Sequence, residues 1–274
     1  MNKRTGRLLA GPYLFWMIGF VILPLLFVFV YAFTNSDGNI SLEAFRTIFT
    51  ATNAKAIGLS LELGLLTTVI CLLLAYPLAM ILNGLKIKSQ SFIVFIFMLP
   101  MWMNFMLRIL AWKQLLNKNG VLNAFLSLLG LPGIDILNTP AAVVFGMVYD
   151  FLPFMLLPIY NAMSRIRQDW IEAARDLGAG NLIILVRIIF PLTFSGVISG
   201  IVMVFVPSLT SFAISQILGG GKVLLIGNVI EQDFMQGNQW NAGSALSMIL
   251  MIFVLLSMAI MNLFQHDEEG TQLW

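Results

Sequence analysis

Charged residues are scarce in this chain of 274 residues, where Asp, Glu, Lys and Arg together account for 10%. An ordinary soluble domain has about 25%. Hydrophobic residues make up 59% of the chain. A soluble fold cannot bury that much apolar surface, so we expect most of the chain to lie in lipid. The formal net charge of +2 is too small to indicate a nucleic-acid partner.

Cysteine and histidine are nearly absent. Cys71 is the one cysteine and lies within an apolar run, so no intrachain disulfide can form. The one histidine, His266, lies near the C-terminus, which argues against a histidine-based metal centre or acid–base catalyst. We therefore expect neither a catalytic residue nor a bound metal in this chain.

A nucleotide-binding P-loop, G-x-x-x-x-G-K-[ST], is also missing. The nearest candidate is the run Gly219-Gly220-Gly221-Lys222, but Val223 follows the lysine. The topology given below places this run outside the cell, where it would not meet cytoplasmic ATP. We interpret it as a turn and expect ATP hydrolysis, if any, on a separate subunit.

Long apolar runs dominate what is present. Each exceeds the roughly 20 residues that cross a bilayer as a helix. We predict six membrane spans, at about 9–33, 58–82, 91–112, 141–163, 183–206 and 244–264. The first is too long for the roughly 7–15-residue apolar core of a signal peptide, so we interpret it as a retained span. Without an internal repeat or a linker, residues 1–274 form one predicted domain.

Prolines lie within or at the ends of several predicted spans. Each removes a helical hydrogen bond and permits a kink. They are Pro24, Pro77, Pro100, Pro153, Pro158 and Pro207. Kinked helices around a cavity suit a transporter, but prolines are also common in membrane helices generally.

Basic residues predict the orientation, because they accumulate in cytoplasmic loops. One side would carry Lys3, Arg4, Arg7, Lys86, Lys88, Arg165, Arg167, Arg175 and Arg187. The other would carry only Arg46, Lys55, Lys113, Lys118 and Lys222. We therefore predict that both termini are cytoplasmic.

The cytoplasmic loop over residues 165–191 contains a short predicted helix, 169–177. Asp169 and Glu172 have the D-x-x-E spacing of a helix start, with Asp169 as N-cap. Gly178 suits the left-handed position that ends a helix. Its apolar face would carry Trp170, Ala173, Ala174 and Leu177, with small alanines that allow another surface to approach closely. An alternative is a helix resting on lipid headgroups, although two acidic residues beside the face suit an anionic membrane poorly.

The loop resembles the cytoplasmic signature of ABC-importer permeases. The matching residues are Glu172-Ala173-Ala174, Gly178, Ile188 and Pro191, with Phe190 where leucine is usual. The stretches LTTVICLLLAYPLA, LPMWMNFMLRILAW, VVFGMVYDFLPFMLLPIYNAM and LLIGNVIEQDF extend the resemblance to permeases of spermidine/putrescine importers.

This resemblance implies a type I importer permease fold, all-α with six transmembrane helices, in the bacterial cytoplasmic membrane. It implies that Trp170, Glu172, Ala173, Ala174, Leu177 and Gly178 form a coupling helix against an ATPase. The implied partners are a dimer of ATPase subunits that binds ATP and Mg, a second permease subunit and an extracytoplasmic substrate-binding protein. Polyamine is the implied cargo, with another small solute on the same scaffold as the alternative.

Three ionisable residues lie at membrane depth: Glu62, Arg108 and Asp150. Each would cost about 2.5–3.5 kcal/mol at a helix centre, so they should face protein or a watery path. We hypothesise that Glu62, Trp102, Tyr149 and Asp150 contact a cationic cargo through charge and aromatic faces. The alternative is that Arg108 pairs with Asp150 or Glu62 as a structural ion pair.

Two other classes of transporter remain open from the residues alone. A gradient-driven secondary transporter would use Glu62 and Asp150 as a relay. A gated channel would need a filter sequence, which is not visible. Uptake that survives a collapsed ion gradient but needs ATP would separate the first class from an ATP-driven importer.

Overall fold

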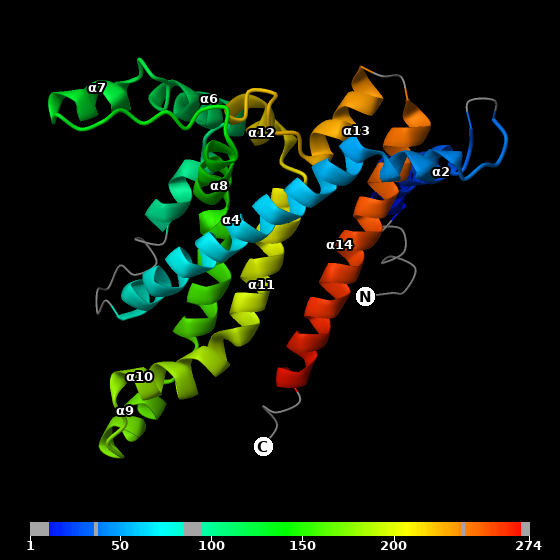
Figure 1. Cartoon of the computed structure of the whole chain (residues 1–274). Coiled ribbons are helices and arrows are strands. Elements are labelled where there is room, and N and C mark those ends of the chain that lie inside the picture. The colour runs from blue at the N-terminus through cyan, green and yellow to red at the C-terminus, as the bar shows by residue number, and fades with distance from the viewer. Residues whose placement is uncertain (1–10, 36–37, 85–94, 237–238, 270–274) are drawn as a thin grey trace. The chain divides into compact units, whose positions relative to one another are not determined.

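The computed structural model of the chain describes residues 11–35, 38–84, 95–236 and 239–269, with side chains as far as residue 259 (Figure 1). The basic residues predicted at positions 3, 4, 7, 86 and 88 lie outside this part. The described residues form helices, turns and one isolated bridge between Thr34 and Ile40. The predicted all-α fold is thereby confirmed.

Five helices in the described part are long and apolar enough to cross a membrane. They are Gly11–Ala32, Ala51–Gly84, Pro140–Ser164, Asn181–Leu209 and Trp240–Ala259. A bent pair, Phe95–Trp102 with Phe105–Leu115, makes a sixth if it is counted as one span.

The chain divides into two compact units, Met1–Lys55 with Val229–Leu255 and Ala56–Asn228 with Leu256–Trp274. The first unit joins α2 (Leu23–Ala32) to the start of α14 (Trp240–Glu269). There the Asn241 amide nitrogen donates to the carbonyl oxygens of Tyr31 and Thr34, at 3.0 and 2.6 Å. It also includes the short helix α3 (Glu43–Arg46) and most of α13 (Ile226–Met235).

The second unit is built around α8 (Pro140–Ser164) and α11 (Phe190–Leu209), which pack along each other. Glycines at positions 196 and 200 of α11 allow the close approach. A Cβ at Gly196 would lie 2.6 Å from the carbonyl oxygen of Pro158, and one at Gly200 would lie 2.7 Å from the Met155 sulfur. Any larger residue at either position would push the two helices apart.

Helix α4 (Ala51–Gly84) joins this unit through buried polar contacts. The hydroxyls of Tyr76 on α4 and Thr193 on α11 lie 3.0 Å apart. The Ser60 hydroxyl accepts a hydrogen bond from the Ile226 amide at 2.8 Å, which satisfies a free donor at the start of α13. Hydrogen bonds from hydroxyl side chains of this kind help to hold apolar helices together in a membrane.

The run Gly219–Lys222 forms a turn, as predicted. Gly220 and Gly221 have φ values of 57° and 76°, in the left-handed region that glycine adopts without strain. A Cβ at Gly220 would lie within 1.9 Å of the Asn138 side-chain oxygen. The turn follows α12 (Phe212–Leu218), whose last carbonyl accepts from the Asn138 amide at 2.8 Å.

The third predicted span, 91–112, contains Pro100, which was expected to permit a kink, and the structure shows a complete break just after it. The segment Phe95–Trp102, whose last turn is η3 (Leu99–Trp102), is bent by 95° against α6 (Phe105–Leu115). Met103 is extended between them, and the Asn104 side chain caps α6 by accepting from the Leu107 amide at 3.2 Å. A capping asparagine starts a new helix and so breaks the span, which hydropathy alone cannot detect.

Candidate functional site

The loop after α8 carries α9 (Gln168–Asp176), the helix that the sequence predicted at 169–177. Gly178 has φ of 81°. Its amide donates to the carbonyl of Arg175, and the Ala179 amide donates to that of Ala174, both at 2.9 Å. This pair of bonds is the Schellman motif, so the predicted role of Gly178 in ending the helix is confirmed.

The start of α9 differs from the prediction. Arg167, with an extended backbone (φ −71°, ψ 131°), is the N-cap, and it makes no side-chain capping bond. Asp169 is already in the first turn, and its carboxylate accepts from the Arg167 guanidinium at 2.7 Å. The expected Asp169 cap was wrong because the cap lies two residues earlier, at Arg167; the acid still complements the positive end of the helix dipole.

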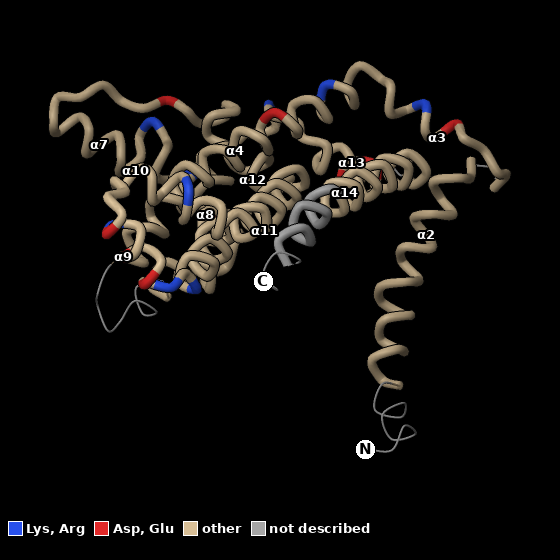
Figure 2. Tube along the Cα trace, turned by 90° about the horizontal axis from the view of Figure 1, so that it is seen from below, with Lys and Arg blue, Asp and Glu red and all other residues tan. Residues whose placement is uncertain are grey.

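Apolar side chains on α9 point away from the rest of the unit. Trp170 is 47% exposed and Leu177, which caps the helix, is 89% exposed. Ala173 is also exposed, whereas Ile171 and Ala174 are half-buried. Figure 2 shows charged positions of both signs around α9. The helix therefore presents a small apolar surface, bordered by the exposed Glu172 carboxylate, to something other than this chain.

The remaining residues of the loop pattern lead directly into α11. Asn181–Ile184 form α10, and Ile188 lies in the π-helical turn η4 (Leu185–Ile189). Pro191 is the second residue of α11 and follows this π-helical turn directly, within the continuous helix Asn181–Leu209. Helix α9 is thus connected to α8 on one side and, through α10 and η4, to α11 on the other.

Of the three ionisable residues predicted at membrane depth, Arg108 and Asp150 form a buried ion pair, and Glu62 lies apart from them. A guanidinium nitrogen of Arg108 on α6 lies 2.6 Å from the Asp150 carboxylate on α8, and the Asp150 side chain is only 2% exposed. Another nitrogen of Arg108 donates to the Pro100 carbonyl oxygen at 2.5 Å. Arg108 therefore connects the two halves of the bent span to α8, as the structural alternative anticipated.

An aromatic ring lies beside this pair. The Arg108 guanidinium carbon lies 5.9 Å from the centre of the Tyr149 ring, within the range of a cation–π interaction. Trp112 packs edge-on against Tyr149, with ring centres 5.0 Å apart. The contact between Arg108 and the Pro100 carbonyl was not predicted from the sequence, because it depends on the bend between the two halves of this span.

Glu62 and Trp102 lie elsewhere. The Glu62 side chain is exposed on α4, and it forms no ion pair with any described residue. Trp102 is exposed and packs edge-on against Phe95, with ring centres 5.4 Å apart. Of the four proposed cargo residues, the structure brings together Asp150 and Tyr149; within the described part, no recorded contact joins Glu62 or Trp102 to them.

Comparisons with known proteins add to this geometry. Residues 74–267 match the family model described as "Binding-protein-dependent transport system inner membrane component". The chain is 36% identical over 264 residues to the "Spermidine/putrescine transport system permease protein PotB" of Haemophilus influenzae, covering 93% of this chain and 92% of that protein. It is 37% identical over 253 residues to the protein of the same name from Escherichia coli strain K12, covering 89% and 92%.

A solved structure shares the fold. It is described as a bacterial alginate ABC transporter in complex with alginate pentasaccharide-bound periplasmic protein. The TM-score is 0.80 at 20% sequence identity, and the match covers 95% of this chain and 94% of that one.

Proposed function

The chain belongs to the inner membrane components of binding-protein-dependent transport systems, and we propose that it is the permease of an ATP-driven polyamine importer. It is a multi-pass, all-α protein of the inner membrane and a transport component rather than an enzyme. Spermidine or putrescine is proposed as the cargo because permeases named for these solutes are 36–37% identical over nearly the whole chain.

The observation that carries the coupling mechanism is the exposed surface of α9. A small apolar face with Ala173 at its centre and Trp170 and Leu177 at its margins suits a cleft in another protein. We propose that this cleft belongs to a separate ATPase subunit, which binds ATP and Mg as a dimer. Both termini and α9 then lie on the cytoplasmic side, in agreement with the basic-residue bias.

The translocation path is proposed to form between this chain and a second permease subunit. A substrate-binding protein would deliver the cargo at the end of α8 opposite α9, and lipid would cover the remaining membrane surface. ATP binding would close the ATPase pair and move α9, and the movement would pass into α8 and α11 through the two connections described above.

Glycine substitutions on either side of Ala179 provide a matched test of the coupling role. Gly178 has φ of 81°, whereas Gly180 has φ of −70°, and a Cβ at either position would meet no atom within 4 Å. A valine is therefore strained only at position 178. We expect Gly178→Val to insert normally but to lower ATP-driven uptake at least tenfold, as Glu172→Lys should, whereas Gly180→Val should keep uptake within about twofold.

The readouts are uptake into vesicles, ATPase activity of the purified complex and the amount of protein in the membrane. ATPase activity that persists without uptake would identify uncoupling. Normal uptake by both Gly178→Val and Glu172→Lys would contradict the coupling assignment. Uptake driven by an ion gradient in the absence of ATP would favour a secondary transporter instead.

Within the path, we assign the cargo's ammonium groups to Glu62 rather than to Asp150. The Asp150 charge is already compensated by Arg108 and lies out of reach of a solute, whereas Glu62 has an exposed carboxylate without a cation in the described part. A lone carboxylate in a span is costly against lipid, which favours a watery path or a partner subunit on its face of α4.

Substitutions of the two acids separate these roles. Glu62→Gln should raise the KM for spermidine at least tenfold with little change in protein level, because it removes a charge that the cation meets. Asp150→Asn should lower the amount of folded protein, because it leaves Arg108 buried without its counter-ion. An unchanged KM for Glu62→Gln would remove Glu62 from the path; stimulation of the ATPase by candidate solutes would independently test polyamine as the cargo.

A further inference from the structure

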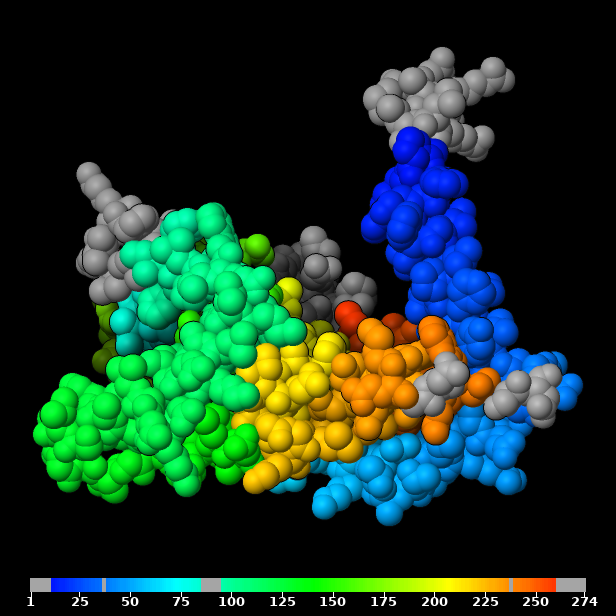
Figure 3. Space-filling view, turned by 90° about the horizontal axis from the view of Figure 1, so that it is seen from above, coloured from blue at the N-terminus to red at the C-terminus, as the bar shows by residue number. Residues whose placement is uncertain are grey.

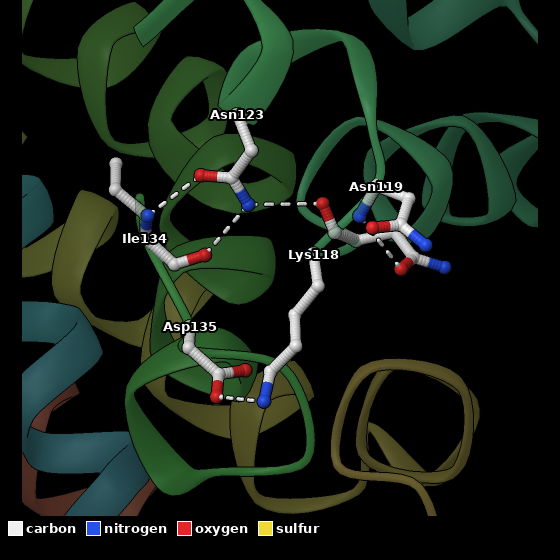
Figure 4. Close-up of polar contacts among 6 residues, drawn as sticks. Lys118, Asn119, Asn123, Ile134 and Asp135 are labelled. Carbon is white, nitrogen blue, oxygen red and sulfur yellow. Dashed lines mark hydrogen bonds and ion pairs between the residues drawn. The ribbon is translucent and has the colours of Figure 1, made fainter. Parts of the chain in front are cut away.

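The segment between α6 and α8 is a pinned hairpin that contains α7 (Val121–Leu128). Figure 4 shows how its two arms are held. The Asn123 side chain donates to the carbonyl oxygens of Asn117 and Ile134, at 3.0 and 2.8 Å, and accepts from the Ile134 amide at 2.6 Å. Lys118 and Asp135 form an ion pair across the base at 2.8 Å. These contacts therefore hold the hairpin in one conformation.

Helix α7 is apolar on the side that it turns away from the protein. Val121 is 71% exposed, Phe125 57% and Leu128 84%, and their spacing of four and three residues places them on one face. Leu122 and Leu126 are half-buried on another face. Residues 119–134 include no Asp, Glu, Lys or Arg. A helix of this composition is not stable with its outer face in water, so something covers that face.

The position of α7 indicates what covers it. Figure 1 shows α6 and α7 running crosswise to α8, near the end where α8 begins. In Figure 3 the surrounding segment, in green, forms a lobe at the margin of its unit. The preceding helix α6 also has exposed apolar side chains, Leu107 and Leu110. Because α6 belongs to the bent membrane span, its exposed apolar side chains already require a lipid environment.

We propose that α7 lies in the bilayer interface, at the end of α8 opposite α9, with Val121, Phe125 and Leu128 among the acyl chains. Interfacial helices bury an apolar face about 5–10 Å into the headgroup and acyl boundary. The pinned arms would hold the paired Lys118 and Asp135, which are exposed, at the polar edge of that layer. This location requires only that the chain spans a membrane, and it holds for any cargo.

A lipid contact fits this face better than a protein contact. A substrate-binding protein docks and leaves, so its docking surface must be stable in water between encounters, and charged residues usually orient such encounters. The outer face of α7 meets neither requirement, because it has three large exposed apolar side chains and no charge. Lipid needs no directional contact and stays in place throughout the transport cycle.

Spin labelling tests this location in the assembled transporter. Cys71 is the one cysteine of the chain and is buried, so a Cys71→Ala background leaves a single engineered label site. We would place Phe125→Cys on the outer face and Ser127→Cys as its control, two residues on and about 200° around the helix. The complex would be reconstituted in vesicles of phosphatidylcholine and phosphatidylglycerol, and collisions with oxygen and with a neutral nickel chelate would be measured.

The quantity to compare is the ratio of collisions with oxygen to collisions with the chelate. Because oxygen concentrates in lipid, this ratio is expected to be at least threefold higher for the label at position 125 than for the label at 127. Val121→Cys gives a second position on the same face if Phe125→Cys does not assemble. Equal access of the chelate to positions 125 and 127 would overturn the proposal. Access of the chelate to position 125 that disappears only when the binding protein is added would also overturn it. Shielding of position 125 from both reagents by a second subunit would do the same.

Discussion

Helices α7 and α9 occur near opposite ends of α8 and are built alike. Each ends in a Schellman motif, with Gly130 at φ of 70° after α7 and Gly178 at φ of 81° after α9. Each also exposes apolar side chains at helical spacing. The difference lies in charge: α9 carries Asp169, Glu172, Arg175 and Asp176, whereas α7 has no charged residue.

This difference separates two uses of an exposed apolar helix in a membrane protein. Charges beside an apolar face give a contact direction and specificity, which suits a protein partner that must dock in one register. An uncharged apolar face has no preferred partner and partitions into lipid. Hydrophobicity alone would have placed both helices in the same class, so the surrounding charge is the more informative feature.

The largest expected effect comes from removing the ion pair between Arg108 and Asp150, which connects α6, the helix before α7, to α8. Arg108→Ala leaves Asp150 buried without a counter-ion, and breaking such a pair costs about 3–5 kcal/mol. We expect a large loss of folded protein and a lower midpoint of thermal unfolding in detergent. Lys113→Ala, an exposed position on the same helix, should leave both nearly unchanged. An equal effect of the two variants would show that the Arg108 pair does not hold α6 in place.

A smaller effect is expected from loosening the hairpin itself. Asn123→Ala removes three hydrogen bonds and leaves the amide and carbonyl of Ile134 without this partner, at a cost of about 1–3 kcal/mol, whereas the Asn117 carbonyl still accepts from the Gly120 amide. A spin label on α7 should then become more mobile, while coupling through α9 continues. The control is Asn119→Ala, because the Asn119 side chain makes no recorded hydrogen bond within the described part. Loss of coupling in Asn123→Ala would show that the two helices are not independent.

Replacing one exposed alanine by leucine on each helix tests whether α7 and α9 contact different partners. Ala173→Leu on α9 adds bulk to a face proposed to enter a protein cleft, and we expect ATP-driven uptake to fall about tenfold, equivalent to about 1.4 kcal/mol. Ala124→Leu makes the same change at an exposed position of α7, where lipid adapts to the added side chain. Uptake by this variant should stay within about twofold of the unaltered protein. A similar loss in both variants would contradict the assignment of different partners.

The smallest effect concerns the ion pair at the base of the hairpin. The hydrogen bond and charge of Asp135 raise the pKa of Lys118 above its usual 10.5. A raised amine pKa stabilises the folded state below the unfolded pKa, and this contribution is lost as the pH rises through the folded pKa. Asp135→Asn should therefore lower the Lys118 pKa, measurable by NMR, and cause a small loss of stability at neutral pH that disappears as the pH rises above the Lys118 pKa. A loss of the same size at neutral pH and above that pKa would show a structural role of Asp135 beyond this pair.

Much of the architecture was predictable because hydropathy and helix termination are local. Twenty apolar residues indicate a span, and a glycine after an amphipathic segment indicates its end, as Gly178 does. Pro100 indicated a kink in this span, but the size of the break and its position at Asn104 were not predictable, because hydropathy does not show which polar side chain will cap a new helix. The choice of Asp150 over Glu62 as the partner of Arg108 also depends on that break, which sets where α6 meets α8.

In the candidate site, too, the local features were predictable and the tertiary ones were not. The residues of α9 were found from their pattern, whereas the start of the helix was misplaced because the first turn can begin on either side of an acidic residue. The surface of α7 was not recognised, since an apolar octapeptide in a loop gives no sign of whether its neighbours cover it. Exposure is a tertiary property, and only the pinned hairpin determines it.

The glycines at positions 196 and 200 have a mechanical consequence. They bring the backbones of α8 and α11 so close that neither helix can slide or tilt without colliding with the other. Because α9 is connected to both helices, we expect a displacement of α9 to move α8 and α11 together where these glycines hold them in contact.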